Sequence, residues 1–556
     1  MRNLLTGLLL FFSVCILSQE YPKDFINPLG ITNYLSGNFG ELRGFHFHSG
    51  LDIKTNQKEG YNIYAIQDGY VSRINISPRG YGNALYITHP NGFTSVYAHM
   101  QQFKGEIEKY TRKQQYNLQQ FSIDIEIPQN ALPVKKGDII GLSGNSGSSF
   151  GPHLHFEVRN TETQETINPF LFGFDVPDSK PPLLRGMYVY ALNGEVAGKK
   201  RYDLIGSKNF NTPIHASGKV GIGVQTFDQL DGANNLNGVY NIKIFSNNEI
   251  IWEFTANKFS FAETRYINCQ TDYAQFMTNK SWIYQGFQMP GNKLSMVSNV
   301  VNNGIIDLEE GKTYDIKIIV SDFAHNSTEG TFKITGKSPP ASKEITKTEN
   351  YLYWDRENYF KNNDIELYFP AESFYEDFEL KYKYQDGKYQ IQNDKVPLHK
   401  FYTLAIFPKQ IPVHQLNKAV IAVKYNYGGR MTTDYFPTEF KDGKLVAEVR
   451  DFGVFVVEID NKIPSITALN VKENATFSNS SSIMRFRIID DQSGIHRHDA
   501  YINGKWVLSV YDKKNDLLTI DLEKEEIQNG NHKLELKITD GKNNVATYEV
   551  NFNKSS

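Results

Sequence analysis

Short stretches of alternating apolar and polar residues recur over the last two thirds of the chain. Tyr314-Asp-Ile-Lys-Ile-Ile-Val320 and Leu534-Glu-Leu-Lys-Ile-Thr539 are typical, and each runs into a turn rich in Asp, Asn or Gly. A period of two residues predicts β-strands with one buried face. Many short strands separated by such turns indicate antiparallel β-sandwiches of the immunoglobulin type. We therefore predict an all-β protein whose C-terminal part contains about three β-sandwich modules.

Three similar breakpoints divide the chain. They are Asp178-Ser-Lys-Pro-Pro182, Gly336-Lys-Ser-Pro-Pro340 and Asn461-Lys-Ile-Pro464. Each places Lys and Pro after a strand-like run, and proline ends a strand because it lacks a backbone donor. These breakpoints, together with the N-terminal leader described below, predict five segments: 1–18, 19–175, 176–340, 341–462 and 463–556.

Two of the predicted modules, 176–340 and 463–556, resemble each other at two places. Phe227-Asp-Gln-Leu-Asp-Gly232 matches Ile489-Asp-Asp-Gln-Ser-Gly494, and both modules have a strand that ends in a D-x-x-x-N turn, at Asp322 and at Asp540. Carboxylates in such turns can bind calcium. Asp and Asn are also common turn formers, and from the sequence we favour that simpler role.

The first 18 residues have the pattern of a secretory signal. Arg2 is followed by an apolar run from Leu4 to Leu17 and by a small residue, Ser18. This run is shorter than the ~20 residues of a membrane span, and no second candidate span is seen. We expect cleavage after Ser18 and export to the cell envelope, with the periplasm favoured. Cys15 raises the alternative of lipid attachment, but the residues before it are a poor context for it.

The net charge and the number of cysteines limit the partners and cross-links that can be expected. The net charge is −3, which gives no electrostatic reason to expect nucleic acid or an anionic membrane as partner. Cys269 is the one cysteine beyond the predicted leader, so no intrachain disulfide is expected in the mature chain.

Histidines gather in the β-rich first piece. Six of the 13 lie within the first 160 residues, at positions 46, 48, 89, 99, 153 and 155. In an extended chain His48 and Asp52 share one side, as do His153 and His155. Two imidazoles and one carboxylate with an open fourth position form a hydrolytic zinc site. Spacing alone leaves open which of His153 and His155 is the third ligand, and it does not exclude His46. His99 is available as the base.

The same segment resembles the lysostaphin-type (LytM) zinc endopeptidases, which cut peptide cross-links of bacterial peptidoglycan. The resemblance covers about 40–160 and is carried by six stretches in the family's order: 48–53 (HSGLDI), 65–71 (AIQDGYV), 82–89 (GNALYITH), 94–100 (TSVYAHM), 134–141 (VKKGDIIG) and 144–157 (GNSGSSFGPHLHFE). Between Met100 and Val134 the chain carries a longer polar insertion, which includes 106–120, than relatives often have.

This resemblance implies particular roles. His48, Asp52 and His155 would be the zinc ligands, and His99 and His153 would orient and deprotonate the attacking water. The expected function is an exported zinc metalloendopeptidase acting on peptidoglycan, with a LytM-like antiparallel β domain over 19–175. The alternative is a scaffold or amidase activator that binds peptidoglycan without cutting it. The C-terminal modules are expected to position the enzyme, to bind a protein partner or to cover the groove.

Overall fold

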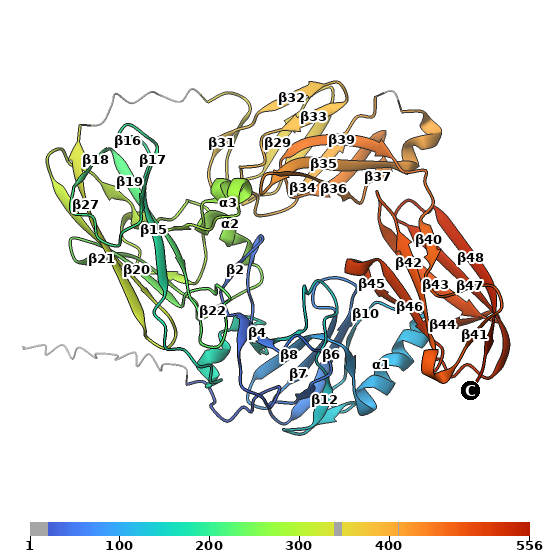
Figure 1. Cartoon of the computed structure of the whole chain (residues 1–556). Coiled ribbons are helices and arrows are strands. Elements are labelled where there is room, and N and C mark those ends of the chain that lie inside the picture. The colour runs from blue at the N-terminus through green and yellow to red at the C-terminus, as the bar shows by residue number, and fades with distance from the viewer. Residues whose placement is uncertain (1–19, 339–346, 410) are drawn as a thin grey trace, which may run out of the picture.

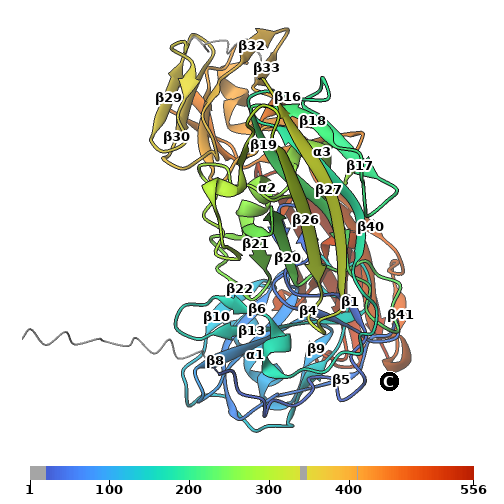
Figure 2. The same ribbon diagram turned by 90° about the vertical axis from the view of Figure 1, so that its left-hand side faces the viewer.

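The computed structural model describes residues 20–338, 347–409 and 411–556. The predicted signal peptide and Cys15 lie outside these residues. Four β-rich parts follow one another around a closed ring, in which the C-terminal part returns to the N-terminal domain beside helix α1 (Figure 1). A view turned by 90° shows the third part at the far end of the molecule, with the long strands of the second part between it and the N-terminal domain (Figure 2). No helix in the described part of the chain is long and apolar enough to cross a bilayer.

The N-terminal domain is built on one large sheet. Its main path runs β1-β4-β13-β8-β7-β6-β10, and neighbouring strands are antiparallel. Alternate residues bury Leu51, Ile53, Leu154 and Phe156 in the core, which leaves the other face of β4 and β13 for polar groups. The strands are β1 (Leu35–Gly37), β4 (Leu51–Lys54), β6 (Gly69–Ile76), β7 (Asn83–Thr88), β8 (Phe93–Met100), β10 (Ile123–Glu126), β11 (Pro133–Val134), β13 (His153–Asn160), β14 (Thr166–Ile167) and β22 (Lys258–Phe259).

Smaller elements complete this domain. A three-stranded sheet comprises β5 (Asn62–Tyr64), β9 (Gln102–Phe103) and β12 (Ile139–Leu142), and a hairpin comprises β2 (Leu42–Arg43) and β3 (His46–Phe47). The polar insertion forms helix α1 (Gly105–Leu118), which ends at Gln119 in the left-handed conformation. The helix buries Ile107, Thr111 and Gln115. The insertion is therefore an ordered helix with one packed face.

The second part consists of two facing sheets. One of its short strands, β22, pairs with β14 and so extends the large sheet of the N-terminal domain. Two short helices, α2 (Ile267–Gln270) and α3 (Tyr273–Asn279), were not predicted. The strands are β15 (Leu183–Ala191), β17 (Arg201–Ile205), β19 (Lys219–Phe227), β23 (Tyr284–Gln285) and β25 (Ile306–Asp307) in one sheet, and β16 (Glu195–Val196), β18 (Ile214–Ser217), β20 (Asn241–Ser246), β21 (Glu249–Thr255), β24 (Val297–Ser298), β26 (Thr313–Ser321) and β27 (Ser327–Lys337) in the other.

The third part is a sandwich of two five-stranded sheets with its own apolar core. One sheet contains β29 (Asn358–Lys361), β30 (Ile365–Phe369), β34 (Tyr402–Ile406), β37 (Glu439–Lys441) and β38 (Lys444–Val449). The other contains β32 (Tyr382–Gln385), β33 (Lys388–Ile391), β35 (Ala419–Tyr427), β36 (Arg430–Phe436) and β39 (Gly453–Ile459), and a separate pair is formed by β28 (Tyr351–Leu352) and β31 (Phe378–Glu379).

The fourth part pairs a four-stranded with a five-stranded sheet. The strands are β40 (Ser465–Ala468), β42 (Ile483–Ile489), β45 (Val510–Asp512) and β46 (Leu517–Asp521), and β41 (Ala475–Phe477), β43 (Ile495–Ile502), β44 (Lys505–Val507), β47 (Gly530–Asp540) and β48 (Val545–Lys554). Its apolar core joins that of the N-terminal domain in one continuous cluster. The predicted all-β class, with sandwich modules after a LytM-like domain, is confirmed, and the exact segment boundaries stay predictions.

Candidate metal centre

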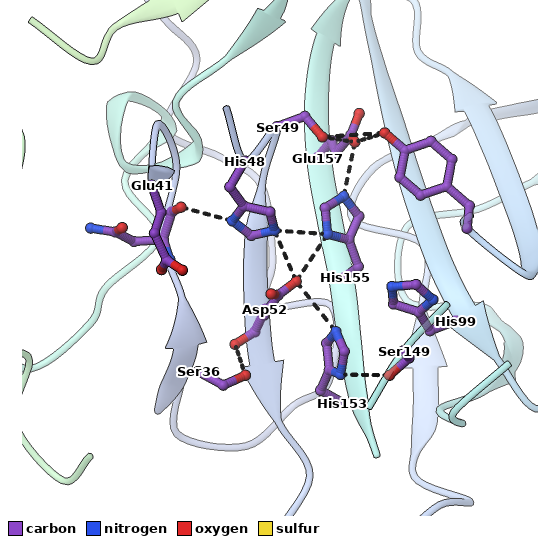
Figure 3. A network of polar contacts seen from close by, with 12 residues as sticks. Ser36, Glu41, His48, Ser49, Asp52, His99, Ser149, His153, His155 and Glu157 are labelled. Carbon is purple, nitrogen blue, oxygen red and sulfur yellow. Dashed lines mark hydrogen bonds and ion pairs between the residues drawn. The ribbon is translucent and has the colours of Figure 1, made fainter. Parts of the chain in front are cut away.

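Two neighbouring strands bring the predicted ligands together. In the antiparallel pairing of β13 with β4, His155 lies directly opposite Asp52. His48 comes four residues before Asp52, on the segment that leads into β4. All three side chains are buried, with 4–5% of each residue exposed. Figure 3 shows them converging on one point.

The three donor atoms lie almost equally far apart. His48 Nε2 is 3.0 Å from Asp52 Oδ1, His155 Nδ1 is 2.9 Å from the same oxygen, and the two nitrogens are 3.1 Å apart. Ligands about 2.0–2.1 Å from a tetrahedral zinc ion are separated by roughly 3.3 Å. The spacing of the three atoms therefore fits a small tetrahedral metal ion.

The outer nitrogens of both imidazoles are already occupied. His48 Nδ1 lies 2.7 Å from the carbonyl oxygen of Asn38, and His155 Nε2 lies 2.8 Å from Glu157 Oε1. Both partners only accept hydrogen bonds, so in the neutral rings these outer nitrogens carry the proton. The inner nitrogens then direct lone pairs at the Asp52 carboxylate. Three converging lone pairs repel one another unless a cation lies between them, so the donor set fits a bound metal.

The same crowding shifts the pKa values of the three converging side chains. Burial lowers the pKa of His48 to about 4, although Asp52 opposes this. Burial also disfavours charge on His155, but hydrogen bonds to Asp52 and Glu157 outweigh it and raise its pKa to about 9. Asp52 is buried too, yet its contacts with His48, His153 and His155 hold its pKa well below the usual value. Without metal, a proton on His155 takes the place of the cation.

Further buried groups orient the three converging side chains. Glu157 is fully buried and accepts hydrogen bonds from Ser49 and Tyr81, and its other oxygen pairs with Arg159 at 2.6 Å. The second oxygen of Asp52 pairs with Arg43 Nη2 at 2.8 Å. Such partners fix the tautomer and orientation of metal ligands.

His153 and His99 lie beside this group and are less buried. His153 Nε2 is 3.3 Å from Asp52 Oδ1, while its Nδ1 is 2.8 Å from the Gly151 carbonyl oxygen. His99 Nδ1 is 2.9 Å from the Ser146 carbonyl oxygen, and burial lowers the pKa of its ring to about 3, with help from His155 and His153. The His99 and His153 ring centroids are 4.9 Å apart. In their neutral forms both rings therefore leave Nε2 unprotonated and able to accept a proton.

His99 has an unusual backbone. Its φ is +58°, in the left-handed region that few residues other than glycine adopt. The register of β7 against β8 shifts at this point, between Asn83 and Leu85. This local irregularity turns His99 out of the strand alternation, and strained residues of this kind concentrate at functional sites.

The remaining candidates lie apart from the group. His46 is exposed on β3 and contacts the Gly44 carbonyl oxygen at 2.9 Å. His89 is buried between the Asp68 carbonyl oxygen, at 2.9 Å, and Ser95 Oγ, at 2.8 Å. The structure thus brings together all five predicted site residues, whose roles stay predictions. Sequence reasoning missed Glu157 and Arg43, although Glu157 continues the even spacing of His153 and His155.

Two family descriptions match parts of the chain. Peptidase family M23 matches residues 46–116 and 116–169, and the Zu5-like domain matches residues 349–460. Residues 46–169 therefore form a peptidase family M23 domain of the LytM/lysostaphin type, as the motifs indicated. The Zu5-like match falls on the third part of the ring.

Relatives of known name match the N-terminal domain. The DD-carboxypeptidase/endopeptidase Mpg of Neisseria meningitidis is 30% identical over 165 residues, which are 29% of this chain and 31% of that protein. The murein hydrolase activator NlpD of Salmonella typhimurium is 29% identical over 135 residues, which are 24% of this chain and 28% of that protein. The chain thus spans about a third of the length of these relatives.

Solved structures match about a quarter of the chain. A mutant catalytic domain of the prophage-encoded M23 protein EnpA from Enterococcus faecalis is 26% identical, with coverage of 28% of this chain and 98% of that chain, at a TM-score of 0.19. The catalytic domain of lysostaphin from Staphylococcus simulans is 22% identical, with coverage of 25% and 91%, also at a TM-score of 0.19.

Proposed function

We propose that this protein is an exported zinc metalloendopeptidase that hydrolyses peptide bonds in the stem peptides or cross-links of peptidoglycan. One observation carries the proposal. The inner nitrogens of His48 and His155 and an oxygen of Asp52 converge within 2.9–3.1 Å, beside two further histidines whose Nδ1 atoms are held by backbone carbonyl oxygens. A site built only to bind a metal has no need of the last pair.

Different residues of the site would have different roles in hydrolysis. His48, Asp52 and His155 would hold a zinc ion, which when bound supplies an electrophile for the scissile carbonyl and acidifies a water. His153 and His99 would accept the proton of the attacking water and pass it to the leaving amine. Arg43 and Glu157 would keep the ligands oriented and would not touch the substrate.

Peptidoglycan as the substrate is supported by the family and by the names of the relatives. One relative is called a DD-carboxypeptidase/endopeptidase and another a murein hydrolase activator. The apolar N-terminal run supports export to the envelope, with the periplasm as the expected site. The other three parts would then present the domain to the wall, bind a protein partner or control access to the groove.

The proposal is tested with purified sacculi and the full mature chain, with zinc or with a chelator. We expect chelator-sensitive release of cleaved muropeptides. His155→Ala should lose both zinc and activity, because it removes a ligand. His153→Ala should keep zinc and lose activity at least 100-fold, in line with the loss of a general base. His46→Ala, a histidine outside the group, should keep both.

The opposite results are equally informative. If the chain binds zinc and sacculi but releases nothing, the catalytic proposal is wrong and the non-cleaving alternative takes its place. Adding a peptidoglycan amidase to that mixture then asks whether the chain activates another enzyme. If His153→Ala keeps full activity, the assignment of His153 as a proton acceptor is wrong, although the metal site stands.

A further inference from the structure

Outside the histidine group, the structure contains two matching clusters of three aspartates, one in the second part and one in the fourth. We infer that each cluster is a calcium site that ties the linker entering a β-sandwich to two turns of that sandwich. This role is separate from the proposed peptidase activity and does not depend on it.

The first cluster consists of Asp178, Asp228 and Asp322. Each offers a carboxylate oxygen, and the three oxygens lie within 4.8 Å of one another. This is about twice a Ca–O distance of 2.4 Å, so one ion can reach all three. Asp228 and Asp322 are each only 1% exposed.

The second cluster consists of Asp460, Asp490 and Asp540, and it meets the same 4.8 Å limit. Asp460 and Asp540 are fully buried. Like Asp322, Asp540 starts a D-x-x-x-N turn, and its Oδ1 accepts from the backbone N–H of Asn544 at 2.8 Å. The corresponding bond from Asn326 to Asp322 is 2.9 Å.

The two clusters correspond residue by residue along the chain. Asp178 and Asp460 both begin a D-x-K-x-P linker that leads into a sandwich, at Asp178-Ser-Lys-Pro-Pro182 and Asp460-Asn-Lys-Ile-Pro464. Asp228 and Asp490 follow the ends of strands β19 and β42. Two independent modules have thus placed three carboxylates at the same three positions, which turn formation alone does not require.

Lys180 and Lys542 lie near enough to interact electrostatically with the clusters, but neither lysine forms a close ion pair with them. Within the described residues, no Lys, Arg or His forms an ion pair with any of the six aspartates. Lys180 lies 4.0 Å from Asp231 instead, and Lys542 donates to the Thr438 carbonyl oxygen at 2.6 Å. Buried charges require a partner, so three adjacent carboxylates call for a cation.

Buried ligand atoms are also left without partners. Asp228 Oδ1, Asp322 Oδ2 and Asp460 Oδ1 have no hydrogen-bond partner among the described residues, and neither side-chain atom of Asn237 has one. Asn237 is 1% exposed and pairs with Asp228 through two backbone hydrogen bonds of 2.8 and 2.9 Å. Residues paired in this way direct their side chains to one face, so the free amide oxygen of Asn237 lies beside the cluster as a further ligand.

The first cluster also borders an empty space. A cavity of about 10 Å³, lined by Asp178 and Asp228, lies where the second part meets the N-terminal domain, close to the size that one small ion or water fills. Calcium is the cation of choice because every available ligand atom is an oxygen, and calcium prefers oxygen ligands in flexible geometry.

The test is to count calcium ions on the full chain after removal of metals, by flow dialysis with radioactive calcium at pH 7.5. We expect two per chain, and a higher midpoint of thermal unfolding with calcium than without. The variants Asp228→Asn and Asp540→Asn, each altered in one cluster, should each bind one calcium ion per chain. The matched controls are Asp231→Asn and Asp491→Asn, neighbours outside the clusters, which should keep two.

Several results would overturn the inference. Failure of the wild-type chain to bind calcium at 5 mM would do so without any variant, even if the variants fold poorly. The inference would also be wrong if both cluster variants still bound two calcium ions. It would likewise be wrong if an equal concentration of magnesium displaced the calcium. Loss of peptidase activity does not bear on the count, because the His155→Ala chain should still bind two.

Discussion

At the scale of single residues, the geometry of the histidine group depends on which imidazole nitrogens carry protons. Neutral His48 and His155 can point their lone pairs inward only because the Asn38 carbonyl and Glu157 take their outer protons. Glu157 has the larger effect of the two, because its charge also raises the pKa of His155. Buried Arg159 forms an ion pair with Glu157 and stabilises that charge. If His155 binds zinc as proposed, the charge of Glu157 makes it a stronger ligand.

Glu157→Gln should therefore weaken zinc binding by 10–100-fold while leaving all three ligands in place. The amide keeps the size of the side chain but loses the charge that polarises His155. Competition with a chromogenic zinc chelator measures the affinity. Glu162→Gln, an exposed neighbour, should bind zinc like the wild type. Unchanged affinity in Glu157→Gln would show that the ring is oriented by the strand alone.

At the scale of elements, the loop from Ser143 to Pro152 is fitted tightly against the end of β8. A Cβ at Gly144 would lie 2.3 Å from the Gln101 backbone nitrogen. Gly147 has φ of +71°, and a Cβ there would lie 2.4 Å from the Gly80 carbonyl oxygen and the Gly82 nitrogen. Between these glycines, Ser146 holds His99 through its carbonyl oxygen. Glycine is needed here for close backbone contact as well as for conformation.

Gly147→Ala should therefore displace Ser146 and misplace His99. We expect zinc binding to be retained and muropeptide release to fall at least tenfold, because the ligand strands are untouched while the second base moves. The control is Gly92→Ala, away from the histidine group, where φ is also positive, at +85°, but a Cβ meets nothing within 4 Å. Equal activity of the two variants would contradict this role of the loop.

The strands and helices also show which features of the site could be predicted from the sequence. Even spacing in an extended chain indicates which side chains share a side, so it pairs His48 with Asp52 and His153 with His155, but only the family resemblance joins the two pairs into one site. The positive φ of His99 and the pairing of Arg43 with Asp52 arise from a register shift and from a separate hairpin, and no local pattern encodes either. The segment 106–120 is the one stretch with a possible helical pattern, and it forms helix α1; the pattern is faint because Ile107 is the one apolar residue among the three that the helix buries.

At the scale of the whole molecule, the closing contact of the ring lies between the fourth part and the N-terminal domain. Arg112 on α1 pairs with Glu525 at 2.9 Å, and Lys514 donates to the Ser149 carbonyl oxygen at 3.1 Å, in the loop that leads to His153. His498 packs against Phe121 of the N-terminal domain, with ring centroids 5.7 Å apart. The last module therefore contacts the loop next to the histidine group through one largely buried, partly polar surface.

Protonation of His498 should loosen this surface. Burial lowers its pKa to about 4, with Asp499 opposing and Arg497 adding to the shift, and its Nδ1 lies 2.9 Å from Ser509 Oγ. An unfolded histidine titrates near 6.5, so the unfolded chain takes up the proton first. The stability provided by neutral His498 is complete above pH 6.5 and falls as the pH drops towards 4, by at most about 1.4 kcal/mol per pH unit.

Calorimetry at pH 7.5 and pH 5.0 should then show a smaller fall in unfolding temperature for His498→Gln than for the wild type. Glutamine can keep the hydrogen bond to Ser509 but has no proton to gain. The other buried histidines titrate equally in both chains, so their contributions cancel in the comparison. His496→Gln, an exposed position two residues away, should behave as the wild type. Equal falls in all three chains would mean that acid opens the ring elsewhere, with the stacked pair of His399 and Tyr266 as the next contact to vary.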